Sequence, residues 1–368
     1  MEGGPLMIFD QIKKLSNVLI KKIDKVEVEP NKCLKVRAVT SNCTACIDVC
    51  PAKSIEISQD SIEINESCFN CGICTTVCLT NALKWNDPPL HQLLNQVKHL
   101  SKNESEVYIA CSISLEGTVR ANVVEVPCLG ILPLEFWINA GLNVPNLKII
   151  HHTESCEGCK IFEGEKVFLE QKKEAEKTVN HTFPICSSIN KVQDHGLVDH
   201  QRRKFLTSLM EEAKVVNSIT VKEVLEVDKS LSPFEKFEAY YRQQDEMEEW
   251  IESTEEIKNN LVGRLLNDSV IHTDKRAMLY EAFEIYPNLQ KQMTFSIPEI
   301  KESCTRCGAC SFLCPTDALI MVDNKSMILS IEKCVFCGLC VEICYEEHIQ
   351  LVPKKGIVFQ DRFLYLLQ

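Results

Sequence analysis

The pattern of apolar and polar positions in the middle of the chain predicts strands that alternate with helices. Apolar side chains recur at helical spacing from Leu90 to Leu100, and we expect Asp87 to cap this helix and Pro88 to be its first residue. Three short apolar runs follow, EVYIAC, NVVEVPC and NLKII. Between the second and third, PLEFWINAG predicts a short helix that ends at Gly141. This alternation is typical of a mostly parallel sheet with helices on its faces.

Other parts of the chain have different patterns. Residues 199–294 contain no cysteine, and SPFE at 232–235 is a capping box that opens a long acidic helix. TDKRAMLYEAFEIY predicts a second helix, which ends before Pro287. We interpret the charges as a solvated helical face. QRRKFL at 201–206 resembles the core of a twin-arginine export signal, but no apolar segment accompanies it, so we expect an ordinary amphipathic helix. Near the C-terminus, ALIMV and MILSI predict short strands.

The composition points to metal binding. The 368-residue chain has 21 cysteines, an odd number, and a net charge of -12. We find no secretory signal at its start and no apolar run long enough to span a membrane. This predicts a cytoplasmic, reducing setting, where clustered thiols bind metals rather than form disulfides. The acidic balance, without a basic stripe, argues against nucleic-acid binding.

Eight cysteines near the C-terminus follow the spacing C-x2-C-x2-C-x3-C twice. Three thiolates from one short loop cover a face of an iron-sulfur cube, and a distant fourth completes it. This stretch resembles the two-cluster [4Fe-4S] ferredoxin family, and we expect Gly308 and Gly338 to let the backbone approach sulfur. Structural zinc is the alternative, but zinc prefers two separated C-x2-C pairs. The resemblance implies one cluster on Cys304, Cys307, Cys310 and Cys344 and another on Cys334, Cys337, Cys340 and Cys314.

A second set of cysteines near the N-terminus has the same spacing with one departure. Thr40 stands where the first ligand is expected, and the nearest candidate, Cys33, lengthens the first gap to nine residues. Because the entropy of loop closure grows slowly with length, we expect Cys33 to reach the cluster. The alternative is a buried Cys33 thiol and a labile three-iron cluster. We assign one cluster to Cys33, Cys43, Cys46 and Cys78 and another to Cys68, Cys71, Cys74 and Cys50.

The five remaining cysteines follow the predicted strands of the middle segment. Because sites in parallel sheets form beyond the carboxyl ends of the strands, we expect four of these thiols to converge there as a [2Fe-2S] or zinc site, with a fifth nearby. We considered His151 and His152 as further ligands and favour the interpretation that they are polar residues at a strand end. Thiol exchange by the C-x-x-C pair is another alternative. The four thiols are Cys111, Cys128, Cys156 and Cys159, and the fifth is Cys186.

Residues 105–190 also resemble the iron-sulfur delta-subunit domain of methyl-viologen-reducing hydrogenases. The matching features are a strand that ends in Cys111, Cys128 followed by Gly130, and the paired-cysteine loop ESCEGCK. The sequence departs from that family because Cys111 stands alone where the family has a close pair, and because the late pair has a shorter gap. The resemblance implies a [2Fe-2S] cluster on a set of five cysteines. It also implies electron transfer between a hydrogenase or formate dehydrogenase and heterodisulfide reductase.

We therefore expect an α+β multidomain protein in which two dicluster ferredoxin modules flank an α/β parallel-sheet domain and a helical connector. We find no dinucleotide-binding, P-loop, metalloprotease or nucleophile-elbow motif, so we expect an electron-transfer subunit without catalytic residues of its own. Its expected partners are a hydrogenase, a formate dehydrogenase or another flavin- or metal-containing oxidoreductase. The alternatives are a reductase whose central cysteines reduce a disulfide or small acceptor, and an iron-sulfur redox sensor. The expected boundaries are 1–84, 85–198, 199–294 and 295–368.

Overall fold

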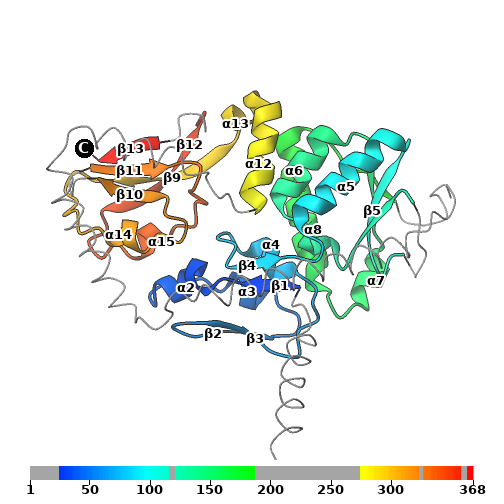
Figure 1. The fold of residues 1–368 in the computed structure, drawn as a ribbon, viewed down its shortest axis with the longest axis horizontal. Coiled ribbons are helices and arrows are strands. Elements are labelled where there is room, and N and C mark those ends of the chain that lie inside the picture. Colours follow the sequence, from blue (N-terminus) through cyan, green and yellow to red (C-terminus); the bar gives the residue numbers. More distant parts are fainter. Residues whose placement is uncertain (1–24, 116–120, 187–273, 323–325, 358–362, 368) are drawn as a thin grey trace, which may run out of the picture. The chain divides into compact units, whose positions relative to one another are not determined.

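The computed structural model describes residues 25–115, 121–186, 274–322, 326–357 and 363–367 (Figure 1). The long acidic helix and the QRRKFL segment expected within 199–294 lie outside the described residues. The described residues fall within one compact unit, and the expected divisions after residues 84, 198 and 294 stay predictions.

A four-stranded sheet forms the middle of the chain. Its strands are β5 (Val107–Cys111), β6 (Val123–Val126), β7 (Leu147–Ile150) and β8 (Ile185–Cys186). The strand order is β6-β5-β7-β8, and every neighbouring pair is parallel. The alternation of helices and strands in the sequence is thereby confirmed as a parallel sheet. The register pairs Cys111 with Val126 and Ile150 with Cys186, so the carboxyl ends lie along one edge.

One helix leads into this sheet, and the others lie between β6 and β7 or between β7 and β8. They are α5 (Leu90–Asn103), the 3-10 turn η2 (Leu129–Ile131), α6 (Leu134–Asn143), α7 (Thr153–Glu157) and α8 (Glu163–Val179). Helix α5 packs on β5 and β6, and α6 packs on α5 and α8. Val107 and Ile109 of β5 face this main core, whereas Tyr108 and Ala110 form a small cluster on the other face.

Two helix boundaries differ from expectation. Helix α5 begins at Leu90 with Pro89 at the N-cap position, so Asp87 lies too far before the helix to cap it, and its carboxylate pairs instead with Lys25 at 2.9 Å. Gly141 does not end α6, which continues to Asn143. A Cβ at Gly141 would lie 2.9 Å from Val179 Cγ2, so this glycine allows α6 to pack closely on the end of α8.

The core of the sheet region is built around Trp137, which is fully buried. Its ring meets Phe136 and Phe183 edge to face, with centroids 5.6 and 5.2 Å apart, and lies 5.7 Å from Phe168. The indole N-H donates to the Leu132 carbonyl at 3.1 Å. Aromatic pairs of this kind add about 0.5–1.5 kcal/mol each beyond the burial of their area. The sheet region therefore has an apolar core built around aromatic side chains.

The C-terminal segment contains two antiparallel sheets and two short helices. The elements are β9 (Thr294–Ile300), α14 (Ala309–Phe312), β10 (Leu319–Val322), β11 (Ser326–Ser330), α15 (Leu339–Glu342), β12 (Ile349–Lys355) and β13 (Phe363–Leu367). β9 pairs with β12, and β10 pairs with β11, which also pairs with β13. The strands expected at ALIMV and MILSI are confirmed as β10 and β11.

The N-terminal segment repeats this order of elements in shorter form. Its elements are β1 (Val26–Val28), η1 (Pro30–Lys32), α2 (Leu34–Arg37), α3 (Ala45–Asp48), β2 (Ile55–Ile57), β3 (Ile62–Ile64), α4 (Ile73–Val77) and β4 (Leu83–Trp85). The pairing β1 with β4 corresponds to β9 with β12, and the antiparallel pair β2 with β3 corresponds to β10 with β11, whereas β13 has no counterpart among the described N-terminal strands. Helix α2 has no counterpart among the C-terminal elements.

The helix predicted to end before Pro287 is confirmed as α12 (Asp274–Ile285), and α13 (Pro287–Gln292) follows it. Helix α12 packs on α6 and α5. Asn139 of α6 donates to the Met278 carbonyl at 2.9 Å and to the Glu281 carboxylate at 3.0 Å. This helix is thus part of the same core as the central sheet.

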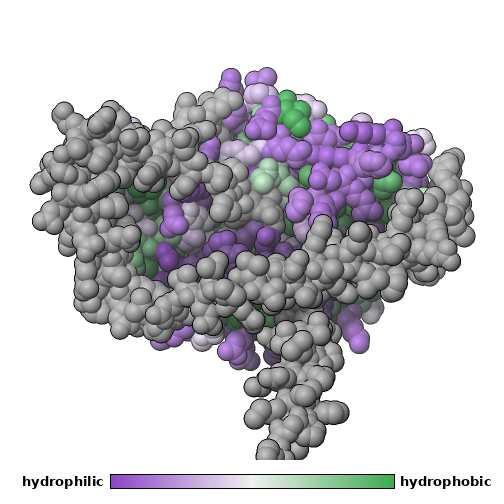
Figure 2. All heavy atoms as spheres, viewed as in Figure 1, coloured by the Kyte–Doolittle hydropathy of each residue, from purple (hydrophilic) through white to green (hydrophobic). Residues whose placement is uncertain are grey.

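The outward side of α5 carries polar residues such as His91, Gln92 and Gln96, and Figure 2 shows hydrophilic side chains over this helix. Among the described helices, none combines the length and the apolar character needed to cross a membrane.

Candidate iron-sulfur and metal centres

Four cysteines of the C-terminal segment gather around one pocket and are called here the outer C-terminal group. Cys304, Cys307, Cys310 and Cys344 line this pocket, and Cys307 is exposed whereas Cys310 is buried. Burial, together with the neighbouring thiols Cys304 and Cys307, raises the pKa of Cys310 to about 12. Thiols that disfavour one another's ionisation in this way are positioned to share a cation.

The inner C-terminal group consists of Cys314, Cys334, Cys337 and Cys340. These four thiols line a second pocket. Burial raises the pKa of Cys334 to about 12 and of Cys337 to about 11, and Cys314 adds to both shifts. The fourth cysteine of each motif therefore lies with the first three of the other motif, which is the crossed arrangement of two-cluster ferredoxins.

The N-terminal segment holds a group built in the same way, the outer N-terminal group. Cys50, Cys68, Cys71 and Cys74 line one pocket. Burial raises the pKa of Cys71, and Cys68 and Cys50 add to that increase. Cys50 comes from the preceding motif, so this group is also crossed.

The inner N-terminal group includes Cys33. Burial raises the pKa of Cys46 to about 12, and the next contributions come from Cys78, Cys33 and Cys43. Cys33 is buried and stands directly before α2, so the nine-residue loop that follows it is partly helical. The structure brings Cys33 into the place of the missing first ligand, while Thr40 is exposed.

Backbone N-H groups point at the cysteine sulfurs of these groups in a repeated pattern. The donor lies two residues after the first cysteine of a motif and four residues after the last. Such hydrogen bonds favour the thiolate and help to set cluster potentials. The N to Sγ distances are 3.3 to 3.4 Å for Asn70 with Cys68, Arg306 with Cys304, Ser54 with Cys50, Ala318 with Cys314 and His348 with Cys344.

Glycines in three of the cysteine loops have left-handed backbone conformations. Gly72, Gly308 and Gly338 have φ of 74°, 76° and 79°, and each precedes the short helix that carries the third cysteine of its motif. A Cβ on Gly338 would have only ordinary contact with the described residues, at 3.5 Å from Leu351. Here the left-handed conformation is what favours glycine, a reason different from the approach to sulfur that we expected.

The central group lies at the carboxyl edge of the parallel sheet. Cys111, Cys128, Cys156 and Cys159 line one pocket there. Burial raises the pKa of Cys128 to about 12 and of Cys156 to about 11, and Cys111 adds to both shifts. Gly130 N and Ile161 N approach the sulfurs of Cys128 and Cys159 at 3.4 and 3.3 Å. The four thiols thus form a donor set that suits iron or zinc.

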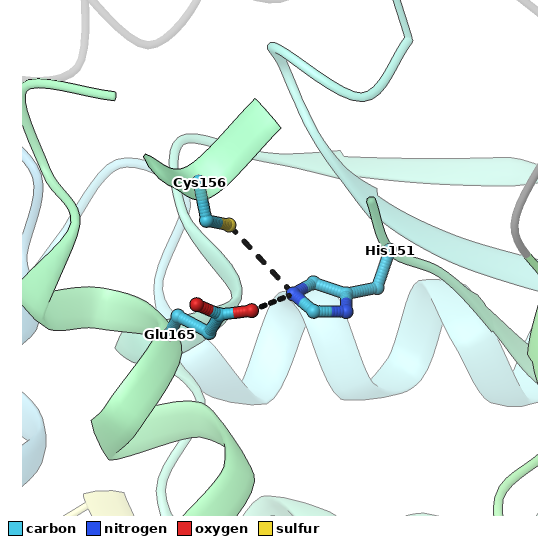
Figure 3. A group of neighbouring side chains, drawn as sticks. All are labelled: His151, Cys156 and Glu165. Carbon is cyan, nitrogen blue, oxygen red and sulfur yellow. Dashed lines mark hydrogen bonds and ion pairs between the residues drawn. The ribbon is translucent and has the colours of Figure 1, made fainter. Parts of the chain in front are cut away.

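Beside this group, His151 lies between Glu165 and Cys156 (Figure 3). Its Nε2 is 3.0 Å from a Glu165 oxygen and 3.7 Å from Cys156 Sγ. Burial lowers the pKa of His151, with Glu165 acting in the opposite direction. In its neutral form the ring would donate an Nε2 proton to this carboxylate, and that nitrogen would then present no lone pair to the thiols. The ligand atoms of the three residues lie within 4.8 Å of one another, and a metal bound there would replace the His151 to Glu165 hydrogen bond.

Cys186 lies on the other face of the sheet from the central group. It is paired with Ile150 and packs in the small cluster with Tyr108 and Ala110. Because successive side chains of a strand point to opposite faces, Cys111 and Cys186 are directed apart. His152 precedes α7 without a side-chain capping hydrogen bond.

The inner groups of the two terminal segments approach each other. Cys43 and Cys337 pack against one apolar cluster around Leu34 and Leu339. Glu342 raises the pKa of both thiols, so it lies near both. Within the C-terminal segment, Cys310 likewise lines the pocket of the inner group.

The outer N-terminal group connects the remaining two groups. Burial raises the pKa of Cys74, and Cys46 of the inner N-terminal group adds to this shift. On its other side, Cys71 and Cys128 pack against the same small cluster with Ile73 and Val167. The five groups therefore follow one another in the order outer C-terminal, inner C-terminal, inner N-terminal, outer N-terminal and central.

Several residues beside these groups were not singled out from the sequence. One of them is Gly164, where a Cβ would lie 2.3 Å from Cys128 Sγ. It packs against Gly130, which the sequence did single out and where a Cβ would lie 2.6 Å from the Gly164 carbonyl. A glycine in the first turn of an amphipathic helix was an available signal for Gly164. Lys275 and Arg276 are buried and donate to carbonyls of ligand cysteines, and no local pattern marks them.

Comparison with known families finds a match at the C-terminus. Residues 297–345 match the 4Fe-4S dicluster domain, and this stretch contains both C-terminal groups. No solved structure matches the chain. The C-terminal segment is thus a dicluster ferredoxin module, and the chain carries at least two [4Fe-4S] clusters, which supports a role in electron transfer.

Proposed function

We propose that the chain relays single electrons through four [4Fe-4S] clusters and a fifth metal centre. The observation that carries the proposal is the serial order of the five cysteine groups, in which each group shares apolar neighbours or mutual pKa effects with the next. The shared order of elements in the two terminal segments supports a second dicluster module at the N-terminus. The mechanism is hopping between adjacent centres, which needs no catalytic side chain.

The two ends of this series are proposed contact points for partner proteins. At one end, Cys307 is exposed and the neighbouring Tyr345 is 99 % exposed. At the other end, the exposed Ile113 lies at the rim of the central group. We propose redox enzymes at these ends, with a hydrogenase, a formate dehydrogenase or another flavin- or metal-containing oxidoreductase as the classes to test.

Iron and acid-labile sulfide per chain, measured on anaerobically purified protein with low-temperature EPR, test the proposal. With a central [2Fe-2S] cluster we expect about eighteen irons per chain, and with central zinc about sixteen. Cys33→Ser should lower the iron count, whereas Cys186→Ser should leave it unchanged because Cys186 faces away from the central group. About eight irons per chain would confine the clusters to the C-terminal module and refute the five-centre series.

A second candidate is a reductase whose central cysteines reduce a disulfide or small acceptor. The contact of Cys156 with His151 at 3.7 Å favours it. The pKa of Cys156 argues against it, because burial and the Glu165 carboxylate raise that pKa to about 11 and disfavour the nucleophilic thiolate. Disulfide turnover by the isolated protein that is lost in Cys159→Ser would establish this activity.

A further inference from the structure

Two neighbouring cations at the start of α12 are buried between the terminal segments. Lys275 and Arg276 are each 6 % exposed. Removing a charged side chain from water is costly unless nearby groups compensate it, so two such residues in sequence require an explanation from their surroundings.

Lys275 is directed at the N-terminal segment. Its Nζ donates to the carbonyl oxygens of Thr76 and Cys78 at 3.0 and 2.6 Å. Cys78 belongs to the inner N-terminal group, 197 residues away in the sequence. Burial lowers the pKa of Lys275, while Glu135 and the thiols of Cys78 and Cys74 act in the opposite direction.

Arg276 is directed at the C-terminal module. Its Nη2 donates to the carbonyls of Ile331 and Cys334 at 3.2 and 2.6 Å. Its guanidinium lies over the Phe336 ring at 4.8 Å, a cation-π contact that fixes its position. Cys334 belongs to the inner C-terminal group.

Each cation therefore reaches a different inner group by the same type of contact. A cluster held by four thiolates is anionic, and one-electron reduction adds a further negative charge to it. A fixed positive charge in a poorly solvated place favours the reduced state over the oxidised state. In return, the negative charge of the cluster offsets the cost of burying the cation.

We propose that Lys275 and Arg276 are paired tuning residues, each of which raises the reduction potential of one inner centre by placing a buried positive charge beside it. One turn of α12 then sets both potentials at the junction of the two terminal segments. The Lys275 half of this proposal rests on the proposed function, because it requires a cluster in the inner N-terminal group. The Arg276 half concerns the C-terminal dicluster module.

The test is an EPR-monitored redox titration of the full-length protein with chemical mediators. Lys275→Met should lower the reduction equilibrium constant of one cluster about tenfold, which is about 59 mV for a one-electron step. Arg276→Met should produce a comparable shift in a different cluster, and the double variant should show both shifts. Cys334→Ser, which changes the spectrum of the inner C-terminal centre, identifies the cluster that Arg276→Met affects.

Lys291→Met is the matched control, since Lys291 is exposed on the adjacent helix α13 and its loss should move no potential. The charge-conserving variants Lys275→Arg and Arg276→Lys should stay near the wild-type potentials. If the Met variants lose iron, Lys275→Gln and Arg276→Gln decide the question, because glutamine retains donors without the charge.

The proposal would be overturned if the uncharged variants kept the wild-type iron content and showed unchanged reduction potentials. It would also be overturned if both substitutions shifted the reduction potential of the same cluster. A wild-type protein with clusters in the C-terminal module alone would instead refute the proposed series. In that case the potential shift in Arg276→Met would still test the C-terminal half.

Discussion

Gly164 lies so close to Cys128 that the central group depends on a missing side chain. A Cβ there would be 2.3 Å from the sulfur and 3.0 Å from Ile73 Cδ1. The carbonyl of Gly130, two residues after Cys128, accepts a hydrogen bond from Thr76 Oγ1 at 2.7 Å. The absence of a side chain at Gly164 therefore leaves room for the Cys128 sulfur between the sheet region and the outer N-terminal group.

Gly164→Ala is expected to displace the Cys128 sulfur and deplete the central centre. Overpacking of this kind costs about 1–3 kcal/mol. Metal analysis should show loss of the central iron or zinc with the [4Fe-4S] content retained. Gly158→Ala is the control, because a Cβ at Gly158 meets nothing within 4 Å among the described residues. Equal metal content in the two variants would contradict this account.

At the scale of elements, the short helix α2 attaches the N-terminal segment to the C-terminal module. Arg37 at its end donates to the carbonyls of Phe312, Leu313 and Cys314 at 2.5, 3.3 and 3.2 Å. These carbonyls stand at the end of α14, where the helix itself provides no donors. The lengthened stretch that begins at Cys33 thus supplies a proposed ligand, Cys33, and a contact between the two terminal segments, through Arg37.

Arg37→Met should loosen this contact, since charged hydrogen bonds contribute about 1.5–3 kcal/mol. Hydrogen exchange should become faster at residues 312–318, and the magnetic coupling between the inner centres should weaken. Lys35→Met on the same helix is the matched control, because Lys35 has no hydrogen bond or ion pair within the described part of the chain. If exchange at 312–318 were the same in both variants, Arg37 would not hold the two segments together.

At the scale of the whole molecule, we expect the terminal segments and the sheet region to depend on metal to different degrees. The N-terminal strands are three residues long, and Cys33, Cys46 and Cys50 are among the buried residues around them. The sheet region has an aromatic core around Trp137. Small segments with little apolar core usually need a bound metal to fold.

Removal of the clusters by oxidation and chelation should therefore unfold the terminal segments first. Amides in β2, β3, α14 and α15 should lose their protection from hydrogen exchange, while those in β5, β7 and α6 stay protected. Simultaneous loss of protection in all these elements would show that the clusters also stabilise the sheet.

Local patterns in the sequence determined a large part of this organisation. Ligand spacing placed Cys304 to Cys344 in a dicluster module because three thiols of one loop must reach one cube. Alternating apolar runs predicted the parallel sheet, since burial on a pleated strand leaves a short-range signature. The helix boundary at Gly141 was wrong because a packing contact with Val179 accounts for that glycine, and local sequence does not encode that neighbour.

Only the tertiary structure decided which groups are neighbours. The serial order of the five groups, the opposite face of Cys186 and the reach of Lys275 to Cys78 all depend on contacts between distant parts of the chain. Ligand spacing and strand period are set by covalent geometry within a few residues, so the sequence displays them directly. Contacts across nearly two hundred residues follow from how the segments pack together, and packing depends on the shape of whole surfaces.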